Sequence, residues 1–218
     1  MPNIFSYHNR AAGLLILGII VVVTVIINWP LPKTIILSVP FTDQAPTGRW
    51  DRNEDCEEAS IAMANAYFEG HRESQLSAEL AQEYIATIRR WEASNIGYNA
   101  DTGAYTTSRM AEKVFGITVK QIRDYTENDL KKELSRGRVI LLPINARLLP
   151  AYAESGPFYH MLVVRGYNDS GFIVNDPGMT QGNGMVYSFD TLRRAAADWN
   201  NSAKNMDASI KIALILSK

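Results

Sequence analysis

The sequence contains very few of the residues that build disulfides and metal sites. Among 218 residues there are one cysteine, Cys56, and three histidines, His8, His71 and His160. A single cysteine cannot form an internal disulfide, and zinc sites use clustered Cys and His ligands that these scattered histidines do not supply. We therefore expect no metal ion and no other cofactor.

The chain also lacks an excess of charge of either sign. It has 22 Lys and Arg residues against 23 Asp and Glu residues, for a formal net charge of −1. Because nucleic-acid binding relies on clustered positive charge, this balance argues against a nucleic-acid partner. Hydrophobic residues make up 46 % of the chain, which is an ordinary globular composition. Nothing in the sequence indicates the oligomeric state.

An uncharged, apolar segment near the amino terminus predicts a membrane anchor. No charged residue occurs between Ala11 and Pro32. About twenty such residues in a helix span a bilayer core of about 30 Å. Trp29 suits the headgroup region, and the prolines that follow it end the helix. A cleaved signal peptide is the alternative, although no small-residue cleavage pattern follows the run.

This anchor divides the chain into four parts. We expect residues 1–10 to form a short cytoplasmic tail, 11–28 a single-pass transmembrane anchor, 29–38 a linker and 39–218 one folded domain. Arg10 precedes the anchor, and positive charge favours the cytoplasmic side of a membrane. The expected location is therefore the cell membrane, with the folded domain outside the cytoplasm.

Within the domain, helices come first and strands later. Hydrophobic spacing and end signals predict helices over residues 56–68, 78–93, 108–115 and 127–135. Alternating or continuous apolar runs predict strands at "ITVKQI", "VILLPI", "HMLVVRGY", "FIVND", "MVYSF" and "SIKIALIL". This order, without regular alternation, predicts an α+β domain with amino-terminal helices packed on an antiparallel sheet.

Cys56 stands at the predicted start of the first helix. Asp55 and Glu58 have the spacing of a capping box, which makes Asp55 the expected N-cap. The helix dipole at this position favours a thiolate, whereas Glu57 and Glu58 repel one. Cys56 is therefore either a nucleophile or a small buried residue whose thiol has no role.

His160 is the expected base for such a nucleophile. It begins a predicted strand, and the "NDSG" turn followed by "FIVNDP" predicts a hairpin that returns Asn175 and Asp176 towards it. Adjacent strand residues point to opposite faces, so only one of the two can meet the imidazole. His71 lies at the far end of the Cys56 helix, roughly 20 Å away, and is excluded as the base.

Four segments together resemble a known family. These are "VPFTDQAP", "DCEEASIAMANAYFEG", "YHMLVVRGYN" and "FIVNDPG". They are similar to segments of the papain-like cysteine peptidases related to the bacteriocin-processing, double-glycine-leader peptidases, and the resemblance covers about residues 39–189. The resemblance implies that Gln44 is the side-chain oxyanion donor and Cys56 the nucleophile. It also implies that His160 is the general base and acid and that Asp176 orients its imidazole, leaving Asn175 a structural role.

The chain departs from that family in three ways. Glu57 follows the cysteine where the bacteriocin-processing enzymes usually have glycine. Gln44 precedes Cys56 by twelve residues, a longer gap than expected, with Trp50 inside it. The transporter part is absent, so cleavage after a double-glycine leader does not carry over.

The sequence thus predicts a membrane-anchored cysteine peptidase that acts on a peptide or protein through a Cys-His-Asp triad and a thioester. The same residues could perform amide transfer on cell-wall peptides, as a transpeptidase or amidase. A catalytically inactive papain-like binding module, with Glu57 impairing the thiolate, is the alternative of a different class. Loops over residues 96–105 and 178–185 could line a substrate groove, although ordinary turns are the expected interpretation.

Overall fold

The computed structural model describes residues 30–50, 54–97, 101–152 and 156–218. Residues 33–218 form one compact unit. Within the described ranges, no helix is both long and apolar enough to cross a membrane. The predicted anchor over residues 11–28 lies outside these ranges.

The unit is built on one antiparallel sheet with the strand order β2-β9-β3-β4-β5-β6, and β1 pairs with β4 outside this path. Its strands are β1 (Ile35–Ile36), β2 (Thr118–Arg123), β3 (Val139–Ile144), β4 (His160–Asn168), β5 (Gly171–Asn175), β6 (Asn183–Tyr187) and β9 (Ile212–Ser217). A separate hairpin consists of β7 (Asp198–Asn200) and β8 (Asn205–Asp207).

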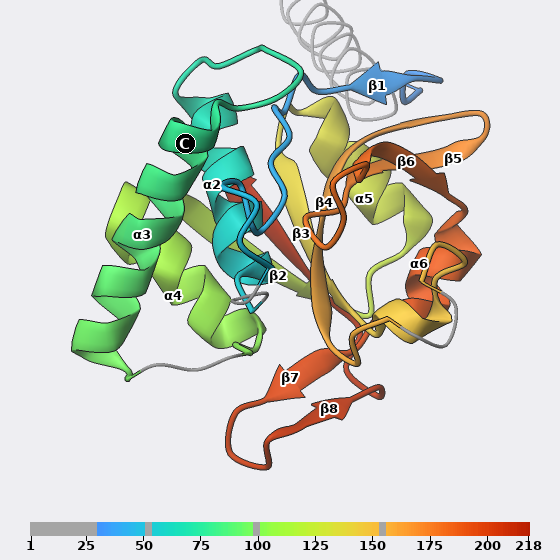
Figure 1. The fold of residues 1–218 in the computed structure, drawn as a ribbon. Helices are drawn as coiled ribbons and strands as arrows, with labels where there is room; N and C mark the ends of the chain where they lie inside the picture. The colour runs from blue at the N-terminus through green and yellow to red at the C-terminus, as the bar shows by residue number, and fades with distance from the viewer. Residues whose placement is uncertain (1–29, 51–53, 98–100, 153–155) are drawn as a thin grey trace, which may run out of the picture. The chain divides into compact units, whose positions relative to one another are not determined.

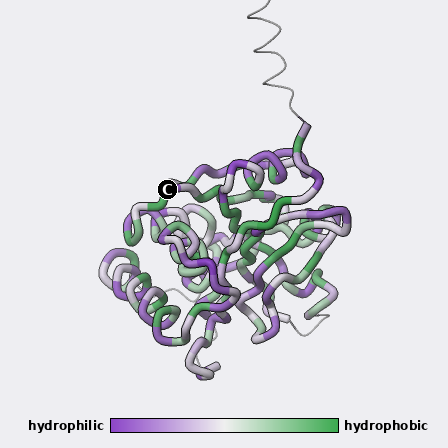
Figure 2. Tube along the Cα trace, turned by 90° about the horizontal axis from the view of Figure 1, so that it is seen from above, coloured by the Kyte–Doolittle hydropathy of each residue, from purple (hydrophilic) through white to green (hydrophobic). Residues whose placement is uncertain are grey.

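Strand β3 is apolar at every position because both faces of the sheet are covered. In β3, Val139 and Leu141 face one hydrophobic cluster, and Ile140 and Leu142 face the other. A strand that is buried on both sides reads as a continuous apolar run and shows no alternation with polar residues. In the hydropathy colouring, green hydrophobic segments lie in the interior of the domain (Figure 2).

Helices cover the two faces unequally (Figure 1). On one face lie α2 (Cys56–Phe68), α3 (Ala78–Asn95) and α4 (Ala104–Phe115), and on the other lie α5 (Glu127–Ser135) and α6 (Phe189–Ala195). A short 3-10 helix, η3 (Ala146–Leu148), follows β3. The predicted α+β architecture, with amino-terminal helices on an antiparallel sheet, is confirmed.

Most of the predicted elements are present, with differences at their ends. The helix starting at Cys56 and the helix over residues 127–135 have the predicted bounds. The other two helices are longer than predicted, because α3 continues to Asn95 and α4 begins at Ala104.

The strand predicted at "MVYSF" ends earlier in the structure than predicted. It ends at Tyr187 because the Ser188 side chain accepts a hydrogen bond from the backbone N–H of Thr191 and so caps helix α6. Helix α6 and the β7–β8 hairpin were not predicted, since their short segments carry no clear periodicity.

Strand β1 attaches the segment before the domain core to the middle of the sheet. Ile35 and Ile36, which the sequence analysis placed in the linker, pair with Tyr167 and Gly166 of β4. A Cβ atom on Gly166 would lie 2.3 Å from the carbonyl oxygen of Ile35, so this close pairing requires glycine. The segment after β1 then leads to Gln44 at the candidate site.

Candidate active site

Helix α2 places Cys56 as its first residue, with a side chain that is almost fully buried. Asp55 is the N-cap residue, as predicted, but its side chain makes no cap hydrogen bond. Arg89 of α3 instead donates from Nε to Asp55 Oδ1 at 2.6 Å. The predicted capping box is therefore wrong, because the guanidinium group of a neighbouring helix occupies the carboxylate.

The hairpin of β4 and β5 brings His160 and Asp176 together. His160 is the first residue of β4, and Asp176 directly follows β5. The distance between His160 Nε2 and Asp176 Oδ1 is 2.7 Å, and both side chains are buried. With Nε2 bound to the carboxylate, Nδ1 is the ring nitrogen left for another partner.

Asp176 Oδ1 accepts two further hydrogen bonds. The Tyr152 hydroxyl donates to it at 2.8 Å, and the backbone N–H of Gly178 donates at 2.9 Å. The Tyr152 ring also packs edge-on against the His160 ring, with centroids 5.7 Å apart. These contacts fix the carboxylate and the imidazole in one arrangement.

Gly178 and Tyr152 were not predicted as site residues. A Cβ atom on Gly178 would lie 2.1 Å from the Tyr152 hydroxyl oxygen and 2.9 Å from His160 Nε2, so no larger residue fits. The glycine directly after "NDP" was the available signal for Gly178. Tyr152 lies in a loop, and no local pattern of the sequence marked it.

Asn175 makes a different set of contacts from its neighbour Asp176. Its Nδ2 donates to the carbonyl oxygen of Val39 at 3.2 Å, and its Oδ1 accepts from Arg165 Nε at 2.8 Å. The backbone N–H of Gly184 donates to the same Oδ1 at 3.2 Å. Asn175 therefore joins the segment before Gln44 to the sheet, and Asp176 is the residue that meets His160.

Gln44 lies beside the loop that follows β5. Its backbone N–H donates to the carbonyl oxygen of Pro177 at 2.9 Å, and its side chain is 6 % exposed. This hydrogen bond places Gln44 next to the residues that hold Asp176. Gln44, Cys56 and His160 all line one cavity of about 590 Å³.

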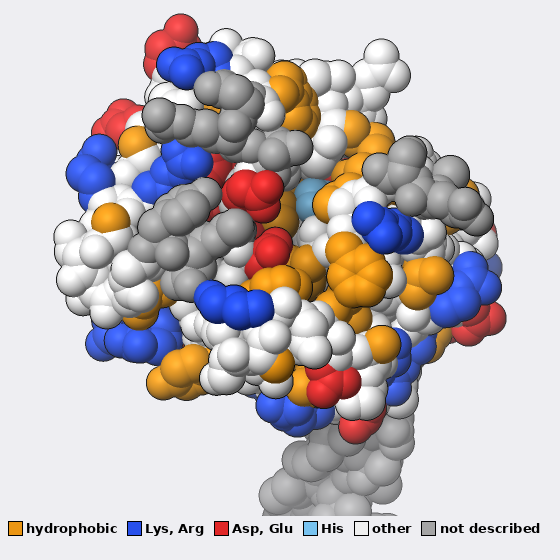
Figure 3. Space-filling view, turned by 60° about the horizontal axis from the view of Figure 1, so that its bottom comes forward, with side chains coloured by type: hydrophobic (Ala, Val, Ile, Leu, Met, Phe, Trp, Pro, Cys, Tyr) orange, Lys and Arg blue, Asp and Glu red, His pale blue; other side chains and the backbone are white. Residues whose placement is uncertain are grey.

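Both acidic and aromatic residues line the cavity. Its lining residues are Gln44, Trp50, Glu54, Cys56, Asp101, Gly156, Pro157, Phe158, Tyr159, His160, Gly178, Trp199, Lys204 and Asn205. Figure 3 shows this hollowed face, where acidic and hydrophobic side chains gather around a histidine. Burial raises the pKa of Asp101 to about 6, and the nearby Glu54 adds to the shift.

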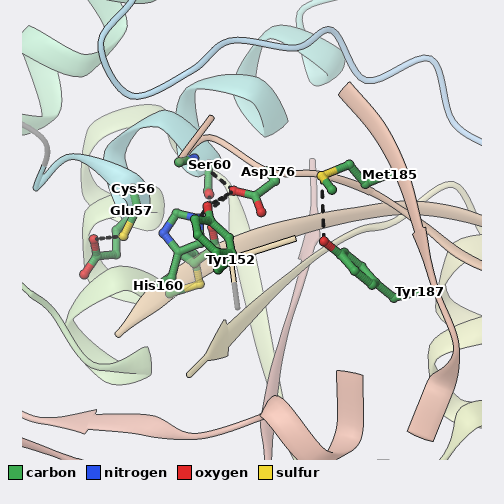
Figure 4. A network of polar contacts seen from close by, with 10 residues as sticks. Cys56, Glu57, Ser60, Tyr152, His160, Asp176, Met185 and Tyr187 are labelled. Atoms are coloured by element: carbon green, nitrogen blue, oxygen red, sulfur yellow. Dashed lines mark hydrogen bonds and ion pairs between the residues drawn. The ribbon is translucent and has the colours of Figure 1, made fainter. Parts of the chain in front are cut away.

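The environment of the Cys56 thiol favours its neutral form. Sγ donates to Glu57 Oε2 at 2.9 Å, and Glu57 is itself 1 % exposed. Burial raises the pKa of the Cys56 thiol well above its usual value, and the adjacent Glu57 and Glu58 raise it further. Figure 4 shows Cys56 and Glu57 on one side of the His160 ring and Asp176 on the other.

The remaining sequence candidates lie at or outside the cavity. His71 binds Glu73 beyond the far end of α2 and does not line the cavity. Of the two candidate loops, Asp101 from the first and Gly178 from the second line the cavity, and residues 98–100 lie outside the described ranges. Among the described residues, no group of three or more His, Cys, Asp and Glu side chains could hold a metal ion.

Comparison with known proteins places this architecture in a family. A crystal structure from Bacillus anthracis, described as a C39-like peptidase, has a TM-score of 0.56 and 17 % identity, covering 86 % of this chain and 98 % of that one. A second, described as a double glycine motif protease from an AMS/PCAT transporter in complex with the leader peptide, has a TM-score of 0.45 and 18 % identity, covering 83 % and 92 %. No curated protein matches. The family described as "Peptidase_C39 like family" matches residues 36–206, and the chain therefore belongs to the C39-like peptidase family.

Proposed function

We propose that this protein is a cysteine peptidase that cleaves peptide bonds with Cys56, His160 and Asp176. The observation that carries the proposal is the 2.7 Å contact between His160 and Asp176 at a cavity that Cys56 also lines. A thiol, an imidazole and a carboxylate that orients the imidazole are the parts that covalent acyl transfer requires. Family membership supports the same class of reaction.

In the first half of the proposed reaction, Cys56 attacks the carbonyl carbon of the scissile bond. The proton on Sγ passes to Nδ1 of His160, because Nε2 already donates to Asp176. The imidazolium then gives this proton to the leaving amine as the C–N bond breaks, which leaves a thioester on Cys56. In the second half, His160 takes a proton from water, and the resulting hydroxide attacks the thioester.

The developing negative charge on the carbonyl oxygen needs donors within hydrogen-bond reach. Gln44 is proposed to supply its side-chain amide, since its backbone is tied to Pro177 beside the His160–Asp176 pair. The backbone N–H of Cys56 lies in the first turn of α2 and is proposed as the second donor, since N–H groups there have no partner within the helix. Such fixed donors lower the barrier by binding the transition state more strongly than the substrate.

A binding module without catalytic activity is the second candidate. The raised pKa of the Cys56 thiol favours it, because a neutral thiol is a poor nucleophile. In this alternative the cavity would hold a peptide without cleaving it. The two candidates differ in whether a peptide is cut, and that difference can be measured directly.

The test compares proteomes of cells that produce the wild-type chain or Cys56→Ala. The peptidase proposal predicts new peptide termini that depend on Cys56, and purified full-length protein should reproduce these cleavages in synthetic peptides. Ser60→Ala, a small change on the same helix that leaves Cys56 in place, is the matched control and should retain the cleavages. Identical sets of termini in wild type and Cys56→Ala would instead support the binding module.

Attachment to a membrane remains part of the proposal and rests on the apolar run from Ala11 to Ile27. We propose that this segment anchors the chain and that the peptidase domain lies outside the cytoplasm. Protease added to intact cells or spheroplasts should then degrade the domain, and the chain should stay with membranes in high salt. A soluble product beginning near Thr34 would show that the segment is a cleaved signal peptide.

A further inference from the structure

We infer that Glu57, in its protonated form, donates a hydrogen bond from Oε2 to the Cys56 thiolate and is thereby a further catalytic residue. The inference deepens the proposed function and rests on it. It concerns the residue that stands where the related enzymes usually have glycine, and it gives that difference a chemical role.

The two oxygens of Glu57 have different partners. Oε1 accepts from the backbone N–H of Thr102 at 2.6 Å, and the Thr102 hydroxyl lies 3.3 Å from the same oxygen. A backbone N–H can only donate, so Oε1 acts as an acceptor in both protonation states of Glu57. Oε1 thus has two donors, whereas Oε2 has Cys56 Sγ alone at 2.9 Å, so an acidic proton is better placed on Oε2. The thiol donates to Oε2, and the thiolate accepts from it.

The arrangement is held from outside helix α2. The Tyr159 hydroxyl donates to the carbonyl oxygen of Thr102 at 2.9 Å and so fixes the backbone that binds Glu57. Glu57 is 1 % exposed and Tyr159 is 4 % exposed, which keeps bulk water away from this pair of contacts. Glu57 thus has one orientation, in which Oε2 faces the sulfur.

Several titratable groups lie around Glu57. On α2 they are Cys56 and Glu58, the loop before α4 contributes Asp101, and Tyr159 approaches from beside β4. Burial raises the pKa of Glu57 to about 8, and Asp101 adds to the shift against the hydrogen bonds from Cys56 and Thr102. Near neutral pH most Glu57 side chains are therefore uncharged.

An uncharged Glu57 changes the chemistry of the nucleophile. When the Sγ–H bond breaks and the proton joins Nδ1 of His160, the sulfur gains a negative charge. A carboxylate at Oε2 would repel that charge, whereas a carboxylic acid donates its proton as a hydrogen bond to it. The Glu57 proton stays on Oε2 throughout, so no further reactant is needed.

The test measures the rate of Cys56 alkylation by iodoacetamide between about pH 6 and 9.5. It uses the full-length chain as wild type, Glu57→Gln, Glu57→Ala and Glu58→Gln. Glutamine is the same size as a protonated glutamate, can accept from Thr102 and can donate from Nε2 to the sulfur, but cannot ionise. Glu58→Gln is the matched control, because it makes the same chemical change one residue further along without a contact to Sγ.

At about pH 6.5, Glu57→Gln should react within about threefold of wild type, and Glu57→Ala at least about tenfold more slowly. As pH rises through about 8, wild-type Glu57 ionises and loses its donor, so Glu57→Gln should become at least about threefold faster than wild type. Glu58→Gln removes one of the acids that raise the thiol pKa, so it should react at least as fast as wild type at every pH and show no crossing of the profiles. A purely structural role for Glu57 would not produce this crossing of the two pH profiles.

Three results would overturn the inference. The first is a wild-type rate that rises relative to Glu57→Gln with pH, which would make the carboxylate a base. The second is a Glu57→Gln variant as slow as Glu57→Ala, and the third is a Glu57→Ala variant as fast as wild type. If Glu57→Ala does not fold, the comparison of wild type with Glu57→Gln still decides the outcome. Alkylation is measured without a peptide, so the expected profiles without any peptide cleavage would refute the peptidase while leaving the role of Glu57 intact.

Discussion

The two sides of the site are stabilised in different ways. On the sheet side, the Asp176 carboxylate receives hydrogen bonds from His160, Tyr152 and Gly178 at 2.7 to 2.9 Å. On the helix side, Cys56 is surrounded by buried acids, and burial raises the pKa values of both the thiol and Glu57. His160, the proposed base, is fixed by hydrogen bonds, whereas the charge on Cys56, the proposed nucleophile, depends on the protonation of the thiol and of Glu57.

The sheet side thus sets the geometry of the His160 ring, and helix α2 sets the protonation of Cys56 and Glu57. On the sheet side we expect the loss of a hydrogen bond to lower activity, because the imidazole would then be free to turn. The helix side responds to charge, because a carboxylate within 2.9 Å of sulfur acts strongly in a buried environment. Changes on the two sides should therefore have different signatures.

Apart from the loss of Cys56 itself, the largest effect is expected for Asp176→Ala. It removes the acceptor that holds His160, and the acylation rate with a peptide substrate or activity probe should fall roughly 10³-fold. Asn175→Ala is the matched control from the adjacent position. It should lower the melting temperature, because the contacts to Val39 and Arg165 are lost, while activity per folded molecule stays within about threefold. The reverse pattern would show that Asn175 orients the histidine.

Gln44→Ala should come next, with a fall in kcat of roughly 10²-fold if its amide binds the oxyanion. The substrate KM should change little, because the interaction is made mainly in the transition state. Gln75→Ala, an exposed glutamine of another loop, is the control. An unchanged kcat for Gln44→Ala, or a change in KM alone, would remove Gln44 from the catalytic group.

Tyr152→Phe should have a smaller effect, since it removes one of three hydrogen bonds to Asp176 and keeps the ring against His160. Turnover should fall about 3- to 10-fold without loss of the folded state, because two hydrogen bonds to Asp176 remain and the loss of one typically costs about 0.5 to 1.5 kcal/mol. The pH profile of kcat should shift, as the charge on Asp176 becomes less shielded. An unaltered profile would show that Tyr152 only fills space. Tyr105→Phe, at an exposed tyrosine, is the control.

The smallest effect concerns stability on the helix side. Burial raises the pKa of Glu58 well above its usual value, with Glu57 and Asp55 adding to the shift. Folding therefore favours the protonated form, and the domain loses stability as pH rises above the unfolded value of about 4.3. Glu58→Gln removes this penalty, so its free energy of unfolding should exceed that of wild type by roughly 1 to 3 kcal/mol at pH 8 and by less at pH 5.

Urea unfolding of both proteins at the two pH values measures this difference. Glu112→Gln, at an exposed position of α4, is the control and should leave stability within about 0.5 kcal/mol of wild type. A Glu58→Gln variant that is less stable than wild type at pH 8 would mean that Glu58 is ionised and paired.

The sheet side of the site could be predicted from the sequence better than the helix side. The turn and the apolar runs fix a hairpin, and a hairpin necessarily returns its second strand to the first, so the approach of residues 175–176 to His160 could be predicted. The capping box at Asp55 failed because Arg89, 34 residues away, takes the carboxylate. Contacts between distant segments of this kind leave no local pattern.

The same reasoning explains the residues that were missed. Tyr152 reaches Asp176 from a loop, and Thr102 reaches Glu57 across 45 residues. Glu57 itself was noted only as a source of repulsion, because the sequence does not show that its side chain is buried and protonated. Burial of a charged residue type follows from the assembled fold, and its pKa follows from that burial.

The most direct test of whether Cys56 and His160 form a catalytic pair is the rate at which iodoacetamide alkylates Cys56 in the full-length protein at about pH 6.5. Only a thiolate reacts with this reagent. If His160 takes the thiol proton and protonated Glu57 donates to the sulfur, these two contacts outweigh the burial that raises the thiol pKa. Cys56 should then react faster than a free thiol with a pKa of about 8.5, and His160→Ala should abolish the advantage. A rate no faster than that of glutathione, and unchanged in His160→Ala, would contradict the claim that Cys56 and His160 form a catalytic pair.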